Sequence, residues 1–135
     1  MKTFLNLIIV LFSLSTSCES QEVNQKIHIN YKAQTRGFLY KISLNNNVLE
    51  IDNNGTLKSK ILNSQQFSEI EKLVFNINFD EIKNNISIDD LAVDKAIEGV
   101  FEVKINSKTH LLNLNHNNLP VKIEELFSQL ERYLE

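Results

Sequence analysis

Apolar and polar residues alternate along much of the first half of the chain, with the two-residue period of half-buried β-strands. Between the alternating runs lie short turns rich in Asn and Gly, and Asn54-Gly55 is typical of a type I′ hairpin. Lys58 and Lys60 indicate that one face of the last run lies in water, at a sheet edge. The alternation predicts four strands, over residues 27–33, 38–44, 48–52 and 57–61.

The period then changes to that of an amphipathic helix. Ser64 is the expected N-cap, and apolar residues at helical spacing predict a helix over about 65–76. Residues 80–98 have no clear period and many carboxylates, and they predict a long loop with some of its apolar residues turned inward and room for a helical turn.

The last part of the chain repeats the two patterns on a smaller scale. Alternation over 100–106 and 109–115 predicts a hairpin, and an apolar stripe beginning near Pro120 predicts a terminal helix with this proline in its first turn. Strands joined by short turns pair antiparallel. The order β-β-β-β-α-β-β-α therefore predicts an α+β domain, with a mostly antiparallel sheet of about six strands and two helices on one face.

The N-terminus has the features of an export signal. Lys2 precedes an apolar run from Phe4 to Phe12, which small residues follow up to Cys18. The run is too short to cross a bilayer, which requires about 20 apolar residues. We expect three segments, a signal peptide, a flexible tether and a single domain, over residues 1–17, 18–25 and 26–135.

The end of this signal, Ser15-Thr16-Ser17-Cys18, resembles the lipobox of bacterial lipoproteins in the serine-rich form of Bacteroidetes. The family usually has Leu three residues before the cysteine, whereas here Leu14 lies one position earlier. The resemblance implies that Cys18 carries two or three acyl chains, such as palmitate, which anchor the chain durably. Glu19 to Glu22 is similar to the acidic stretch that marks surface export in that group, and we expect an outer-membrane lipoprotein of the cell envelope.

Charge and cysteine content narrow the classes of partner. Removing Lys2 with the signal leaves 13 of the 14 Lys and Arg against 17 Asp and Glu, a formal charge of −4. Nucleic-acid binding and anionic-lipid binding both require a basic surface, so neither is expected. Cys18 is the only cysteine, which excludes an internal disulfide.

The domain also resembles a family of small bacterial lipoproteins with no assigned activity. Many members carry Cys-x-x-x-Cys-Pro between the first two strands, where this chain has Ala33 to Phe38 and no cysteine. The resemblance implies a fold and a compartment, and it implies no mechanism and no cofactor. The stretches that carry it are Arg36-Gly37-Phe38-Leu39-Tyr40, the helix at 65–76 with Ile77-Asn78-Phe79, Ile86 to Asp94, and His116-Asn117-Asn118-Leu119-Pro120.

Two groups of residues are candidates for a site. Asp89, Asp90 and Asp94 supply the oxygen ligands that Ca²⁺ prefers, but they lack the D-x-D-x-D-G pattern of a calcium loop. Three aspartates at these positions are equally typical of a solvated loop or of helix N-caps. Arg36, Phe38 and Tyr40 form a candidate partner contact, since Arg and aromatic residues often anchor interfaces. The alternation equally makes the two aromatic residues part of the core.

The three histidines, His28, His110 and His116, lack the spacing of metal sites, so we expect them to lie at the surface or in hydrogen bonds. No motif for a nucleophile or a phosphate loop is present. We therefore expect a non-enzymatic binding or accessory module with an envelope protein as partner. The alternatives are a metal-dependent or hydrolytic enzyme that uses the acidic loop, and a lipid or small-molecule carrier with an apolar cavity between helices and sheet.

Overall fold

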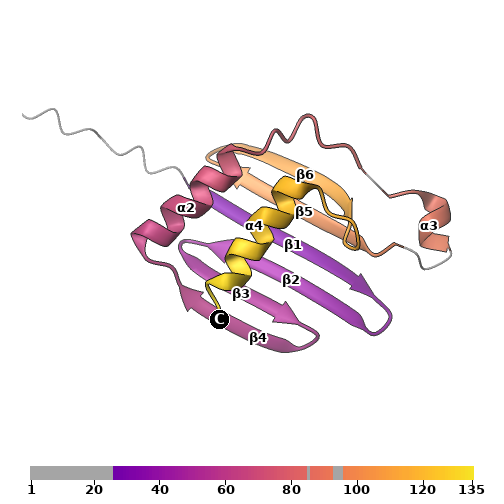
Figure 1. The fold of residues 1–135 in the computed structure, drawn as a ribbon, viewed down its shortest axis with the longest axis horizontal. Coiled ribbons are helices and arrows are strands. Elements are labelled where there is room, and N and C mark those ends of the chain that lie inside the picture. The colour runs from indigo at the N-terminus through magenta and orange to yellow at the C-terminus, as the bar shows by residue number, and fades with distance from the viewer. Residues whose placement is uncertain (1–25, 85, 93–95) are drawn as a thin grey trace, which may run out of the picture.

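Six antiparallel strands form one sheet, and two long helices lie across one of its faces (Figure 1). The computed structural model describes residues 26–84, 86–92 and 96–135, so the signal peptide, the tether, Cys18 and Asp94 lie outside the described residues. The predicted α+β class and the element order are confirmed. The strands are β1 (Ile27–Thr35), β2 (Phe38–Asn45), β3 (Val48–Asn53), β4 (Thr56–Ile61), β5 (Glu98–Ile105) and β6 (Lys108–Asn115), in the spatial order β4-β3-β2-β1-β5-β6.

Two-residue turns set the register of the hairpins. Asn54 and Gly55 have φ angles of 52° and 87°, and a positive φ at both positions is the type I′ geometry that the sequence predicts. Asn46 and Asn47 make the equivalent turn between β2 and β3, with φ angles of 48° and 67°. Asn tolerates this conformation better than other residues with a side chain, which explains why Asn occupies these turns.

Helices α2 (Ser64–Phe75) and α4 (Val121–Arg132) lie where the helical periods predict them. The N-cap of α2 is Asn63 and not Ser64, because the Asn63 side chain accepts from the Gln66 N–H at 2.8 Å while the Gln66 side chain accepts from the Asn63 N–H. Pro120 is the N-cap residue of α4 and lies just before its first turn, in contrast to the prediction.

The acidic segment between α2 and β5 contains one short helix, α3 (Ile88–Ala92), at the side of the domain (Figure 1). Ile82 packs against the core, as expected of an apolar residue turned inward. Ile88 is 85% exposed and is not one of the residues that turn inward.

The core lies between the helices and one face of the sheet. Inward-facing residues of β1, β2, β3, β5 and β6 meet the apolar stripes of α2 and α4, and the opposite face of the sheet is open to solvent. The largest fully buried side chains include Tyr31, Phe101, Ile42, Leu44, Leu49, Ile70, Leu114, Leu126 and Leu130.

In the described parts of the chain, no helix combines the length and the apolar character needed to span a bilayer.

Candidate binding hollow beside His116

Tyr31 and His116 meet beside helix α4, although 85 positions separate them in the chain. Tyr31 lies in the central strand β1 with its ring buried, and its ring centroid is 4.6 Å from that of Phe127 of α4. His116 follows β6, and its backbone N–H donates to the Ile97 carbonyl at 2.8 Å. The Tyr31 hydroxyl and His116 Nδ1 are 2.8 Å apart, so a hydrogen bond holds the imidazole against the sheet.

Gly99 of β5 makes this hydrogen bond possible. A Cβ atom at position 99 would lie 2.1 Å from the Tyr31 hydroxyl oxygen, closer than two non-bonded atoms can approach. Gly99 is opposite Ala33 of β1 in the antiparallel register, so two small residues adjoin. The phenol ring of Tyr31 occupies the space that a side chain at position 99 would fill.

Aromatic rings of β2 flank the same imidazole. The ring centroids of Phe38 and Tyr40 each lie 5.2 Å from that of His116. Burial lowers the pKa of His116, although the nearby Glu131 carboxylate opposes this effect, so the imidazole is neutral at pH 7. A neutral imidazole among aromatic rings adds no positive charge to its surroundings.

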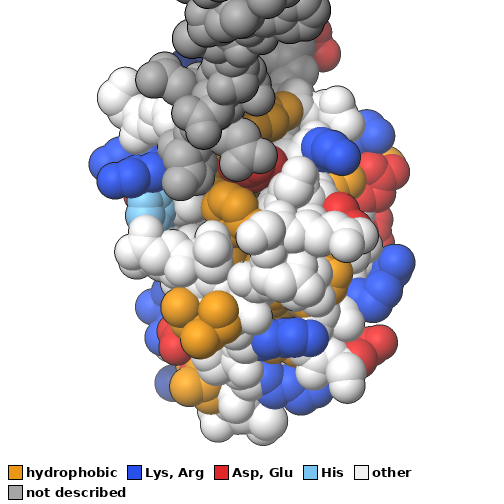
Figure 2. Space-filling model, turned by 90° about the vertical axis from the view of Figure 1, so that its left-hand side faces the viewer, with side chains coloured by type: hydrophobic (Ala, Val, Ile, Leu, Met, Phe, Trp, Pro, Cys, Tyr) orange, Lys and Arg blue, Asp and Glu red, His pale blue; other side chains and the backbone are white. Residues whose placement is uncertain are grey.

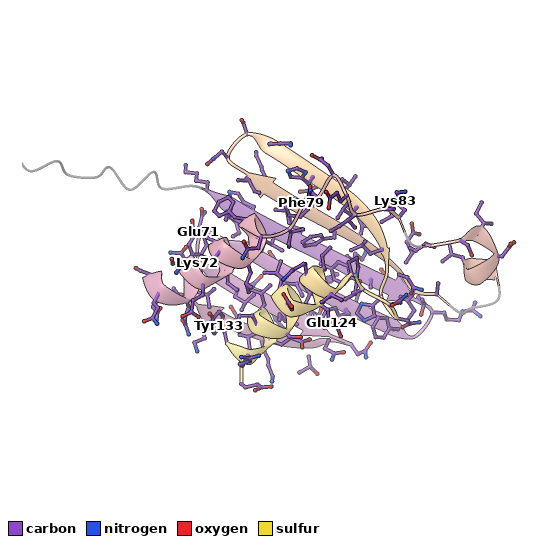
Figure 3. All side chains as sticks on the ribbon, turned by 45° about the horizontal axis from the view of Figure 1, so that its top comes forward. Glu71, Lys72, Phe79, Lys83, Glu124 and Tyr133 are labelled. Carbon is purple, nitrogen blue, oxygen red and sulfur yellow. The ribbon has the colours of Figure 1, made fainter. Side chains whose placement is uncertain are left out.

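Tyr40 joins the sheet to helix α4. Its hydroxyl donates to the Glu131 carboxylate, and burial together with this hydrogen bond raises the pKa of Tyr40 well above its ordinary value. A second pair of the same kind joins the two helices, because the Tyr133 hydroxyl donates to Glu69. Figure 3 labels Glu124 in the first turn of α4 and Tyr133 at its C-terminal end. The carboxylate of Glu131 is therefore held in place at the edge of the core while it remains exposed to solvent.

These residues line a hollow of about 340 Å³ that is open to solvent and that we call the His116 hollow. Its charged residues in the described part of the chain are Glu124 and Glu131, and no Lys or Arg is among its lining residues. A second hollow of about 470 Å³ adjoins it along α4 and shares Tyr40, Asn53 and Glu131 with it. The lining residues of the His116 hollow are Phe38, Tyr40, Asn53, His116, Leu119, Glu124, Phe127, Ser128 and Glu131.

The chemistry of the His116 hollow suits a positively charged group with an apolar stem. Carboxylates attract the charge, and aromatic faces attract cations through the quadrupole of the ring. Such a stem finds apolar walls in Phe38 and Leu119, which are both half-buried. The volume lies within the range of small-ligand sites, which begins near 300 Å³.

The structure brings together two of the three residues of the expected partner contact. Phe38 and Tyr40 line the His116 hollow on the helix side of the sheet, whereas Arg36 is exposed in the turn between β1 and β2. Tyr40 thus belongs to the core through its ring and to the hollow through its hydroxyl.

The acidic candidates lie elsewhere. Asp89 is exposed on α3, while the side chain of Asp90 and all of Asp94 lie outside what the structure describes. Among the described residues, no group of three or more His, Cys, Asp or Glu side chains is placed to hold a metal ion.

Sequence reasoning missed the role of His116, Tyr31 and Glu131. They come from different parts of the chain, and only the sheet order, in which β5 alone separates β6 from β1, brings the residue after β6 within reach of the Tyr31 hydroxyl. The available signal was that Tyr31 is a phenol on the buried face of a strand, because a buried tyrosine hydroxyl requires a polar partner.

We compared the chain with protein-family models, with curated proteins and with solved structures, and none of them matches it.

Proposed function

We propose that this chain is a lipid-anchored binding module of the cell envelope, without catalytic activity, whose ligand places a positively charged group in the His116 hollow. The export signal ending at Cys18 supports the anchor. The observation that carries the binding role is the exposed Glu131 carboxylate, which Tyr40 fixes beside aromatic rings and a neutral imidazole. The ligand class is an ammonium or guanidinium group on an apolar stem, as in a Lys or Arg side chain of an envelope protein.

A titration followed by NMR tests the binding role. The probe is N-acetyl-lysine amide, and the neutral comparison is N-acetyl-norleucine amide, which has the same stem without the charge. We expect the lysine probe to shift the amide signals of Phe38, Tyr40 and His116 and to bind more tightly than the neutral probe. Glu131→Gln should weaken the lysine probe about five-fold to ten-fold, which corresponds to about 1 kcal/mol for a partly exposed charge pair.

Glu125→Gln is the matched control, because Glu125 is an exposed carboxylate of the same helix that pairs with Lys122 at 3.1 Å and does not line the His116 hollow. It should leave binding of the lysine probe unchanged. Equal affinity for the charged and neutral probes, or equal effects of the two Glu→Gln variants, contradicts the proposal.

The anchor has its own test. In a bacterial host that processes lipoproteins, we expect the wild-type chain to incorporate labelled palmitate and to sediment with membranes. Cys18→Ser should abolish the label and release the protein from the membrane fraction. Membrane association and labelling that survive this substitution would show that Cys18 is not the anchor.

A further inference from the structure

In the part of the chain that the structure describes, the edge strand β4 presents unpaired backbone groups to solvent. The Leu62 N–H donates to the Asn47 carbonyl at 2.8 Å, which makes these two residues a hydrogen-bonded pair. Hydrogen-bonded pairs alternate with non-hydrogen-bonded pairs along an antiparallel ladder. In the register of β3 and β4, the backbone groups of Lys58 and Lys60 therefore bond to β3, and those of Leu57, Ser59 and Ile61 point away from the sheet.

All six residues of β4 are exposed, including Leu57 and Ile61, which are 62% and 76% exposed. Apolar side chains reach the surface among lysines on the side of the domain where β4 ends (Figure 2). An unpaired edge of this kind is a template for another strand, because the added strand satisfies every outward-facing N–H and C=O group.

The side chains of β4 differ between its two faces. Cross-strand partners share a face, so Lys58 and Lys60 lie on the helix side with Ile51 and Leu49. Lys60 Nζ donates to the Tyr133 carbonyl at 2.9 Å, and in the described part of the chain Lys58 forms no ion pair. The other face of β4 carries Leu57, Ser59 and Ile61, which adjoin the carboxylates of Glu50 and Asp52 on β3.

These charges disfavour pairing of β4 with a second copy of itself. An antiparallel pair centred on Ser59 brings Lys58 opposite Lys60 of the other copy, twice. Because Ser59 faces outward, the lysines occupy non-hydrogen-bonded positions, where opposing side chains are closest. Like charges directly opposite each other destabilise a strand pair.

We propose that β4 is a docking edge for an extended acidic segment of an envelope partner, and that Lys58 and Lys60 select this segment and exclude a second copy of the chain. The segment pairs through its backbone with Leu57, Ser59 and Ile61. It places carboxylates opposite Lys58 and Lys60, and apolar residues on the open face, where Glu50 and Asp52 would repel further carboxylates. Lys58 also lines the second hollow, which adjoins the His116 hollow, but the docking edge is formed by the backbone of β4 and does not rest on the proposed binding role of Glu131.

A charge reversal tests the proposal without knowledge of the natural partner. In a homodimer of Lys58→Glu, each introduced carboxylate lies opposite Lys60 of the other copy, so both repulsive pairs become attractive. With Cys18→Ser to remove the lipid, we expect the parent protein to sediment as a monomer and the Lys58→Glu variant to dimerise at least ten-fold more tightly. Ser59→Pro added to Lys58→Glu removes an outward N–H without touching the pairing to β3, and it should restore the monomer.

Peptide probes test the selectivity directly. A peptide that alternates valine and glutamate should shift the NMR signals of the outward amides of Leu57, Ser59 and Ile61, and its valine–lysine counterpart should bind the parent protein at least ten-fold more weakly. Lys58→Glu should narrow or reverse this preference. A monomeric Lys58→Glu variant, a parent protein that already dimerises through β4, or a glutamate peptide that leaves these three amides unshifted would overturn the proposal.

Discussion

The two edges of the sheet differ in how the rest of the chain covers them. At β6, the segment that follows α2 lies alongside the strand, the Asn84 side chain accepts from the Asn113 N–H at 3.1 Å, and Phe79 stacks on His110 with ring centroids 4.5 Å apart (Figure 3). At β4, every residue is exposed and Leu57, Ser59 and Ile61 direct their backbone groups into solvent. The segment after α2 thus covers part of the β6 side, at Asn113 and His110, whereas in the described part of the chain the outward backbone groups of β4 have no such cover.

The largest expected effect is on the free energy of unfolding and concerns Phe79, which covers the β6 side of the sheet. Phe79 is 7% exposed and packs on Phe101 and His110, so Phe79→Ala should lower the free energy of unfolding by about 3 kcal/mol, within the range for buried Phe→Ala substitutions. Phe75→Ala is the matched control, because Phe75 is 50% exposed on α2, and it should change stability by less than about 0.5 kcal/mol. Urea denaturation measures the free energy of unfolding of both variants. Equal losses of stability would show that Phe79 is not part of the packing that covers β6.

The next effect lies at Gly99 of β5. Gly99→Ala places a methyl group where the Tyr31 hydroxyl lies, and we expect a loss of about 1–3 kcal/mol together with displacement of His116 from its hydrogen bond. Ser59→Ala on the exposed β4 should have little effect on stability. A Gly99→Ala variant with wild-type stability and an unchanged His116 ring signal would contradict the close packing at this position.

A smaller effect is expected on acidification. Burial holds the pKa of His116 below its unfolded value of about 6.5, so the unfolded chain binds the proton more readily. Stability should therefore fall as the pH drops below about 6.5 and continue to fall until the folded protein also takes up the proton. His116→Gln should reduce the loss of stability between neutral pH and about pH 5, measured by denaturation at each pH. An identical pH dependence in the two proteins would show that His116 does not contribute.

The alternation of apolar residues was sufficient to predict the sheet, because a half-buried strand requires it. It left open which face of β4 turns toward the helices. That answer was present in Asn54-Gly55, since a two-residue turn pairs Asn53 with Thr56 and thereby puts Lys58 on the face of the buried Ile51. The N-cap of α2 was likewise readable from Asn63 and Gln66, which have the spacing of a capping box.

The His116 hollow could not be predicted in the same way. Tyr31, Tyr40, His116 and Glu131 come from β1, β2, the turn after β6 and α4, and their meeting depends on the placement of β5 next to β1. No local period encodes this pairing, because it joins strands that are about 70 positions apart in the chain. The alternation did predict that Phe38 and Tyr40 lie on one face of a strand, and both residues line the hollow.

Amide hydrogen exchange at the two edges tests the central contrast most directly. The N–H groups of Asn113 and Ser59 both point away from the sheet, but only that of Asn113 has a partner in the described part of the chain, the Asn84 side chain. We expect Asn113 to exchange at least ten-fold more slowly than Ser59, each relative to its unstructured rate, and Asn84→Ala to remove this difference. Equal protection of the two amides, or stronger protection of Ser59, would contradict the account of a covered β6 edge and an open β4 edge.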